Sequence, residues 1–143
     1  MLAAVAVVVF VAVAGAGFWL SEPQARKMQV DSPDFSSKEF RLTDQSGASR
    51  STADFAGAPV ALFFGYTYCP DVCPMTLTLL AHALDEAGDR GLDTAALQTI
   101  FVTVDAERDT PDQLAAYLSL FDTEVTGLTG SSEALVKVQR DFG

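Results

Sequence analysis

The sequence predicts an α/β domain built on a mainly parallel sheet. Residues 60–67 and 97–105 are short apolar runs without the polar alternation of a half-exposed strand, as is typical of strands buried on both faces, so we expect residues 60–67 at the centre of a parallel sheet. A stretch with apolar residues at helical spacing follows each run, and strands that alternate with helices favour a parallel sheet covered by helices. A chain of 143 residues can form one such domain and a terminal appendage.

The first 20 residues are apolar and carry no charged side chain. As a helix, residues 2–20 cross roughly 30 Å of hydrocarbon at about 1.5 Å per residue. We therefore expect a transmembrane anchor over residues 1–20, with a cleaved signal peptide as the alternative. Basic residues follow this segment and none precedes it, the reverse of the positive-inside pattern for a domain outside the cytoplasm. We expect the true start to lie upstream of Met1.

Residues 21–37 are polar and contain two prolines, so we expect a tether there and a folded domain over residues 38–143. Apolar and polar residues alternate at 40–43, and a Ser-Gly turn follows, which predicts a strand that opens a hairpin. Residues 51–59 are expected to form a connecting loop.

Start signals predict three helices in the rest of the chain. Pro74 fits the first turn of a helix that extends to about residue 87. Residues 110–113 combine an N-cap Thr, a Pro at the first helical position and a Gln at the capping-box position, for a helix that ends near residue 121. Residues 124–130 predict a third short strand, and Ser131 or Ser132 begins a last helix.

The chain is acidic, with a formal net charge of -10 at pH 7. Because like charge repels phosphate, this balance argues against nucleic acid or an anionic membrane surface as the main partner. It suits a basic protein partner or a cation.

Cys69 and Cys73 are the only cysteines and follow the first buried strand, at the sheet edge where open α/β domains place their chemistry. Pro74 predicts that Cys73 lies at a helix N-terminus, whose positive end would lower the pKa of that thiol. Pro70 restricts Cys69 towards extended backbone, so we expect a loop that runs into a helix. If the segment turns helically, both sulfurs point to the same side.

Four interpretations of the cysteine pair are open: a structural disulfide, unrelated core cysteines, a dithiol–disulfide redox pair and a soft-metal site. A structural disulfide would close a very small loop and stabilise little, and two prolines and an aspartate are poor neighbours for core cysteines. The redox pair is chemically sound, although it normally uses the shorter C-x-x-C spacing. Two thiolates with one further ligand suit Cu(I), whereas zinc needs more Cys or His ligands than this sequence offers.

The third ligand of such a copper site is not evident. His82, the only histidine, is about half a helical turn out of phase with Cys73 and about 13 Å further along the axis, so we expect an exposed helix residue rather than a ligand. Asp71, Asp105 and the Met75 thioether are available, but carboxylates prefer harder metals and the thioether ranks low.

Residues 40–143 resemble the SCO/SenC family of copper chaperones. The resemblance is carried by FFGYTYCPDVCP, VTVDAERDTPDQLAAYLSLFD and GLTG, which occur in this order. It implies a thioredoxin-like fold and a single-pass anchor in the inner membrane with the domain on the periplasmic side. The activity that it implies is delivery of copper to the binuclear copper site of cytochrome c oxidase subunit II, reduction of that site's thiols, or both.

The resemblance also implies roles for individual residues. Cys69 and Cys73 would bind a copper ion when reduced and form a reversible disulfide when oxidised. The family's third ligand is a downstream histidine to which no residue here corresponds, so we expect a C-terminally truncated chain that lacks the last strands and the closing helix of the fold. Apart from the resemblance, strand order places the charged group after the second buried strand near the thiol loop; this group consists of Asp105, Glu107, Arg108 and Asp109. Asp71 and Asp105 are candidates for thiol tuning or partner docking, with charge pairing and helix capping as the alternative for the charged group. A thiol–disulfide oxidoreductase or a redox sensor would use the same pair.

Overall fold

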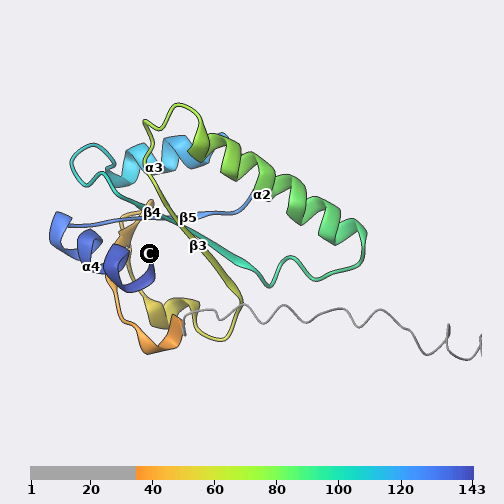
Figure 1. The fold of residues 1–143 in the computed structure, drawn as a ribbon, viewed down its shortest axis with the longest axis horizontal. Coiled ribbons are helices and arrows are strands. Elements are labelled where there is room, and N and C mark those ends of the chain that lie inside the picture. The colour runs from red at the N-terminus through yellow and green to blue at the C-terminus, as the bar shows by residue number, and fades with distance from the viewer. Residues whose placement is uncertain (1–34) are drawn as a thin grey trace, which may run out of the picture. The chain divides into compact units, whose positions relative to one another are not determined.

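A computed structural model describes residues 35–143, drawn in colour in Figure 1. Its elements are η1 (Phe35–Ser37), β1 (Arg41–Asp44), β2 (Ser49–Ser51), η2 (Thr52–Phe55), β3 (Val60–Gly65), α2 (Val72–Asp89), β4 (Gln98–Thr103), α3 (Pro111–Leu118), β5 (Thr126–Thr129) and α4 (Ser132–Phe142), where η denotes a 3-10 helix. The expected anchor over residues 1–20 and most of the expected tether lie outside the described residues. Between residues 35 and 143, no helix is long and apolar enough to cross a bilayer.

The five strands form one sheet in the order β2-β1-β5-β4-β3. β3, β4 and β5 are parallel, whereas β1 is antiparallel to both β2 and β5. The sheet is therefore mixed rather than mainly parallel, because the predicted hairpin joins it through β1, which pairs with the distant β5 in antiparallel orientation. β3 was expected at the centre but is the last strand of the sheet in the described part of the chain. The apolar composition of a strand shows that both faces of the sheet are covered there, but it does not show that another strand pairs along each of its edges.

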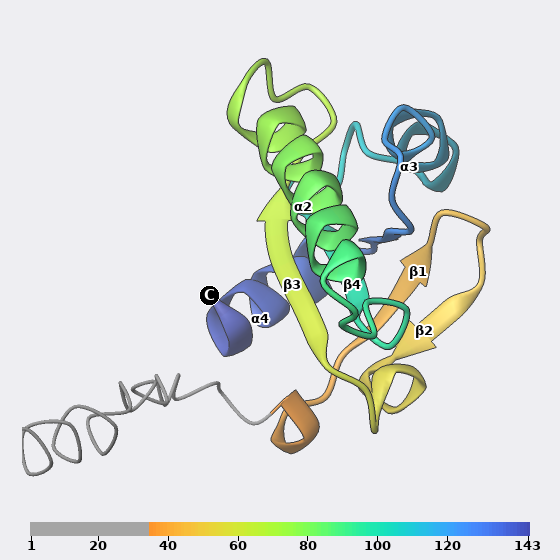
Figure 2. The same cartoon turned by 90° about the vertical axis from the view of Figure 1, so that its right-hand side faces the viewer.

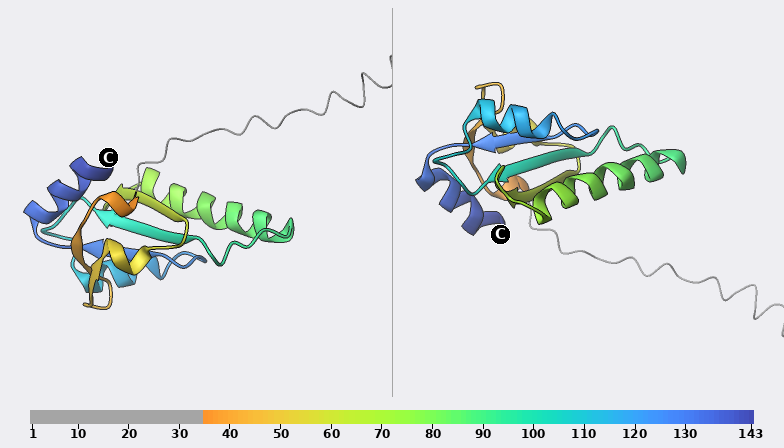
Figure 3. Two further views of the ribbon diagram at one scale, coloured as in Figure 1. Left: turned by 90° about the horizontal axis from the view of Figure 1, so that it is seen from below. Right: turned by 90° about the horizontal axis from the view of Figure 1, so that it is seen from above.

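Helices cover both faces of the sheet. α2 and α3 lie over one face in Figure 1, and α4 lies on the other. The view from above in Figure 3 has α2 and α3 in front of the strands, and the view from below has η2 on the opposite side.

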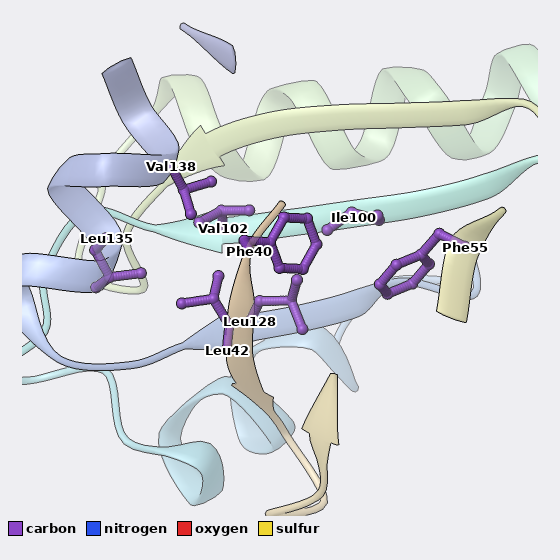
Figure 4. Close-up of a cluster of buried hydrophobic side chains, with 8 residues drawn as sticks. All are labelled: Phe40, Leu42, Phe55, Ile100, Val102, Leu128, Leu135 and Val138. Carbon is purple, nitrogen blue, oxygen red and sulfur yellow. The ribbon is translucent and has the colours of Figure 1, made fainter. Parts of the chain in front are cut away.

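Each face has its own buried cluster. The α2/α3 cluster contains Leu77, Phe101, Leu114, Leu118 and Val125. The α4 cluster, shown in Figure 4, contains Phe40, Leu42, Phe55, Ile100, Val102, Leu128, Leu135 and Val138.

The predicted starts of α3 and α4 are confirmed by their caps. The Thr110 hydroxyl accepts a hydrogen bond from the Gln113 backbone N–H at 3.2 Å. The Ser131 hydroxyl accepts one from the Ala134 N–H, also at 3.2 Å. Such caps satisfy N–H groups that have no partner within the helix, so these two boundaries could be predicted from local sequence alone.

The packed structure begins slightly before residue 38. The Phe35 ring lies 6.1 Å from the Phe40 ring and 5.3 Å from the Phe142 ring, centroid to centroid. Residues 51–59, expected to be a plain loop, contain η2, whose Phe55 is buried in the α4 cluster. These aromatic contacts join the amino-terminal segment to α4.

The turn between β1 and β2 is organised around the buried Asp44. Its carboxylate accepts hydrogen bonds from the Ser46 hydroxyl, the Ala48 N–H and the Arg50 guanidinium, at 2.5, 3.0 and 2.7 Å. Burial alone would raise the pKa of Asp44, but these hydrogen bonds outweigh it and lower the pKa to about 2. Asp44 therefore stabilises the folded state only while it is ionised.

We expect Asp44→Asn to lower the free energy of unfolding in a pH-dependent way. The folded pKa lies below the value of 3.8 for an unperturbed Asp, so the contribution of the carboxylate is present above that value and is lost as the pH falls towards 2. The deficit of the variant should be about 2 kcal/mol at pH 7 and about 1 kcal/mol at pH 3, measured by urea denaturation. Glu124→Gln, at an exposed position, is the control. An equal deficit of Asp44→Asn at both pH values would contradict the assignment.

Candidate functional site

The two thiols lie at the connection between β3 and α2. β3 ends at Gly65 and α2 begins at Val72, so Cys69 is in the connecting loop and Cys73 is in the first turn of the helix. Figure 2 shows this loop beyond the arrowhead of β3, at the upper, amino-terminal end of α2. The predicted position at the carboxyl end of the strand is confirmed. Both cysteines are free thiols, Cys73 buried and Cys69 partly exposed.

The helix N-terminus acts on Cys69 and not, as expected, on Cys73. The backbone N–H of Cys73 donates a hydrogen bond to the Cys69 sulfur at 3.4 Å. A hydrogen bond from the Cys73 thiol and those from backbone N–H groups lower the pKa of Cys69. Burial raises the pKa of Cys73, and its hydrogen bond to Cys69 raises it further. Cys73 was predicted to be the more acidic thiol, but its sulfur is turned into the core while the first N–H groups of α2 point at Cys69.

Gly65 allows Cys73 to pack against the sheet. A Cβ atom at Gly65 would lie 2.6 Å from a ring carbon of Phe101 and 3.0 Å from the Cys73 sulfur. Both contacts are too close for a side chain, so the absence of one lets the Cys73 sulfur and the Phe101 ring meet over the end of β3.

A buried carboxylate, Asp109, anchors the thiol loop. It accepts hydrogen bonds from the Thr67 N–H at 3.0 Å, the Thr67 hydroxyl at 2.6 Å and the Thr103 hydroxyl at 2.5 Å. The Asp109 side chain is fully buried. Asp109 was predicted only as one member of the charged group that follows the second buried strand. A usable signal was present, because a threonine in the loop after the first buried strand and a threonine at the end of the second supply donors for a carboxylate in the next loop.

Asp105 and Asp71, the two aspartates predicted to tune the thiols or to dock a partner, differ in their contacts. The Asp105 carboxylate pairs with Arg108, which lowers the pKa of Asp105. The Arg108 guanidinium also lies 5.1 Å from the centroid of the Tyr68 ring, next to Cys69. The Asp105 carboxylate is thus linked to the thiol loop through Arg108, and the Asp105 backbone N–H donates a hydrogen bond to the Thr103 hydroxyl at 3.0 Å. Asp71 is the N-cap residue of α2, but its side chain makes no capping hydrogen bond and is exposed.

The donor set at this position consists of two sulfurs. Within residues 35–143, no cluster of three or more His, Cys, Asp or Glu side chains is arranged to hold a metal ion. His82 is exposed on α2, as predicted, and Met75 is 51% exposed. Two soft donors joined by a hydrogen bond, one of them open to solvent, fit a cuprous ion better than a hard cation.

We expect alkylating reagents to modify Cys69 before Cys73, because Cys69 is the more acidic and the more exposed thiol. Iodoacetamide at pH 7, followed by peptide mass spectrometry, should show at least tenfold faster labelling of Cys69. Cys73→Ala should slow the labelling of Cys69, since it removes the thiol donor that lowers the pKa of Cys69. Faster labelling of Cys73 in the parent chain would contradict this order.

Comparisons with known proteins agree with this geometry. The SCO1/SenC family model matches residues 29–143. The SCO2 homologue of Danio rerio mitochondria is 42% identical over 107 residues, covering 73% of this chain and 37% of its own. SenC of Rhodobacter capsulatus is 40% identical over 106 residues, covering 72% of this chain and 47% of its own. The chain thus spans less than half the length of these curated relatives.

Solved structures show the same fold. ScoI of Bradyrhizobium japonicum with copper bound has a TM-score of 0.67 at 40% identity, covering 73% of this chain and 65% of that one. Yeast Sco1 with copper bound has the same TM-score and coverage at 31% identity. The architecture is accordingly the thioredoxin-like Sco fold, with a mixed sheet flanked by helices. From its sequence, its fold and its paired thiols, the chain belongs to the SCO1/SenC family.

Proposed function

We propose that this chain is a copper chaperone that acts in the assembly of cytochrome c oxidase. The observation that carries the proposal is the juxtaposition of Cys69 and Cys73 at an accessible end of the sheet. It is supported by the copper-bound state of the Bradyrhizobium and yeast relatives. Copper is the cargo in this proposal, and a protein that hands its cargo on is not an enzyme.

Cys69 and Cys73 are the proposed copper ligands. Cys69 is the first thiol available as a thiolate, because α2 lowers its pKa, and Cys73 then has to lose its proton in a buried position. Thiolate ligands select Cu(I), and protons compete with the metal for them. Because no further Cys, His, Asp or Glu joins them in the described residues, we expect weaker binding than at a three-ligand site.

Transfer to an acceptor proceeds by exchange of ligands at the exposed side of the pair. Val72 and Met75 are 62% and 51% exposed beside the cysteines, which lets an acceptor approach the sulfurs over an apolar rim. The acidic chain favours an acceptor with a basic docking face. We propose cytochrome c oxidase subunit II as this acceptor and the periplasmic side of the inner membrane as the location. In this proposal residues 1–20 are the anchor, 21–37 the tether and 38–143 the working domain.

Reduction of a partner disulfide is the second candidate function. The unequal acidity of the two thiols favours it, since a redox pair needs one attacking thiolate and one resolving thiol. Cys69 would attack a disulfide of the partner and release one partner thiolate. Cys73 would then attack the Cys69 sulfur, form the Cys69–Cys73 disulfide and release the second partner thiol. The partner gains two electrons, which this pair loses.

We expect Cys69→Ser and Cys73→Ser each to weaken Cu(I) binding at least tenfold, about 1.4 kcal/mol, in competition titrations with a cuprous chelator under reducing conditions. The double variant and the oxidised chain should lose specific binding, and the parent should bind less tightly at pH 5 than at pH 7. His82→Ala is the matched control and should bind as the parent does. If the double variant retains the parent's cuprous load, the chaperone proposal fails.

A trapping experiment distinguishes the two candidates. In a pure chaperone, Cys73→Ser should leave no mixed disulfide with the oxidised subunit. In a reductase, the same variant should accumulate a Cys69-linked mixed disulfide, because the resolving thiol is missing.

A further inference from the structure

A tight turn places Cys69 at the start of α2. The Cys69 backbone N–H donates a hydrogen bond to the Tyr66 carbonyl at 3.1 Å, which closes a β-turn with Thr67 and Tyr68 as its central residues. We call residues 66–69 the Cys69 turn. The Cys69 sulfur accepts the Cys73 N–H at 3.4 Å just beyond it. The place of this sulfur therefore depends on how firmly the Cys69 turn is held.

Both central residues of the Cys69 turn are held by the loop between β4 and α3. On the buried side, the N–H and the hydroxyl of Thr67 donate to the Asp109 carboxylate at 3.0 and 2.6 Å. On the exposed side, the Arg108 guanidinium lies 5.1 Å from the centroid of the Tyr68 ring. The Arg108 side chain is 57% exposed and Tyr68 is 59% exposed. Two neighbouring residues of the turn thus meet two neighbouring residues of the loop.

The Arg108 guanidinium is fixed by its own loop. Its Nε donates to the Asp105 carboxylate at 2.5 Å, and a terminal nitrogen pairs with the same oxygen. The Asp109 N–H donates to the Asp105 carbonyl at 3.0 Å, which closes the loop on itself. A planar guanidinium that is held by a carboxylate still offers its flat face to an aromatic ring, and it loses little further freedom when it stacks there.

We propose that Arg108 is a positioning residue of the copper site, whose stack on the Tyr68 ring holds the exposed side of the Cys69 turn. The proposal rests on the proposed binding of copper by Cys69 and Cys73. Arg108 supplies no ligand and acts through Tyr68, the residue that precedes the first sulfur. A turn that is ordered in advance favours binding, because the metal does not have to order it.

The test is the Cu(I) affinity of the full chain in mild detergent, measured by competition with a cuprous chelator under reducing conditions. Arg108→Gln and Tyr68→Leu should each weaken binding about threefold, within the range that an exposed contact between a cation and a ring supplies. The double variant should bind no more weakly than either single variant, because both changes remove the same contact. Tyr68→Leu leaves every charge in place, so a shared loss comes from the stack and not from the charge of Arg108.

Two further variants serve as controls. Tyr68→Phe keeps the ring and should recover the affinity that Tyr68→Leu loses. Arg90→Gln is the matched arginine variant, because Arg90 is exposed and pairs with the Glu86 carboxylate at 2.5 Å in the last turn of α2. This variant should bind Cu(I) as the parent does.

Amide hydrogen exchange gives a readout without copper. In the reduced, metal-free chain, Arg108→Gln and Tyr68→Leu should speed exchange in the peptide that spans the Cys69 turn about threefold, because the turn opens more often. Exchange in the peptides of α4 should match the parent, which separates a local role from a general loss of stability.

The outcomes distinguish this proposal from the proposed function. Parent-like affinity or parent-like exchange in Arg108→Gln and Tyr68→Leu overturns the role of Arg108 and leaves the copper proposal standing. Losses of affinity that add in the double variant overturn it as well, because the two residues then act independently. If the parent binds no Cu(I), the copper proposal fails and the role of Arg108 fails with it.

Discussion

Three hydrogen bonds to the buried Asp109 carboxylate hold the thiol loop against the end of β4. The donors come from Thr67 in the loop and Thr103 at the end of the strand. A buried carboxylate without such donors would be strongly unfavourable. The thiol loop, the end of β4 and the loop that carries Asp109 therefore have to pack together so that all three hydrogen bonds form. That arrangement fixes where the loop begins, and hence where Cys69 lies relative to the first turn of α2.

The unequal character of the thiols follows from this geometry. α2 begins with its free N–H groups directed at the Cys69 sulfur, while Cys73 is turned towards Phe101 and Gly65. One sulfur is thereby kept acidic and accessible, and the other is shielded and reluctant to ionise. A soft-metal carrier and a dithiol reductant both benefit from this division, which explains why one pair of residues suits both proposed activities.

The two faces of the sheet differ in how they relate to the thiol pair. The α4 face holds the larger cluster, which joins the hairpin, η2 and α4 and contains neither cysteine. The α2/α3 face, on which the thiol site lies, holds the smaller cluster, which includes Leu77, Phe101 and Leu114. Phe101, which belongs to this cluster, and the Cys73 sulfur lie close to the same position over Gly65.

Local sequence determined the buried strands, the capped starts of α3 and α4 and the placement of the cysteines after β3, because these depend on periodicity, capping and strand order within short windows. Tertiary structure alone decided the mixed sheet, the edge position of β3, the greater acidity of Cys69 and the burial of Asp109. The reason is separation along the chain. Asp109 meets Thr67 across 42 residues, and whether a polar group is buried or a thiol is desolvated depends on such distant neighbours, which no local pattern encodes.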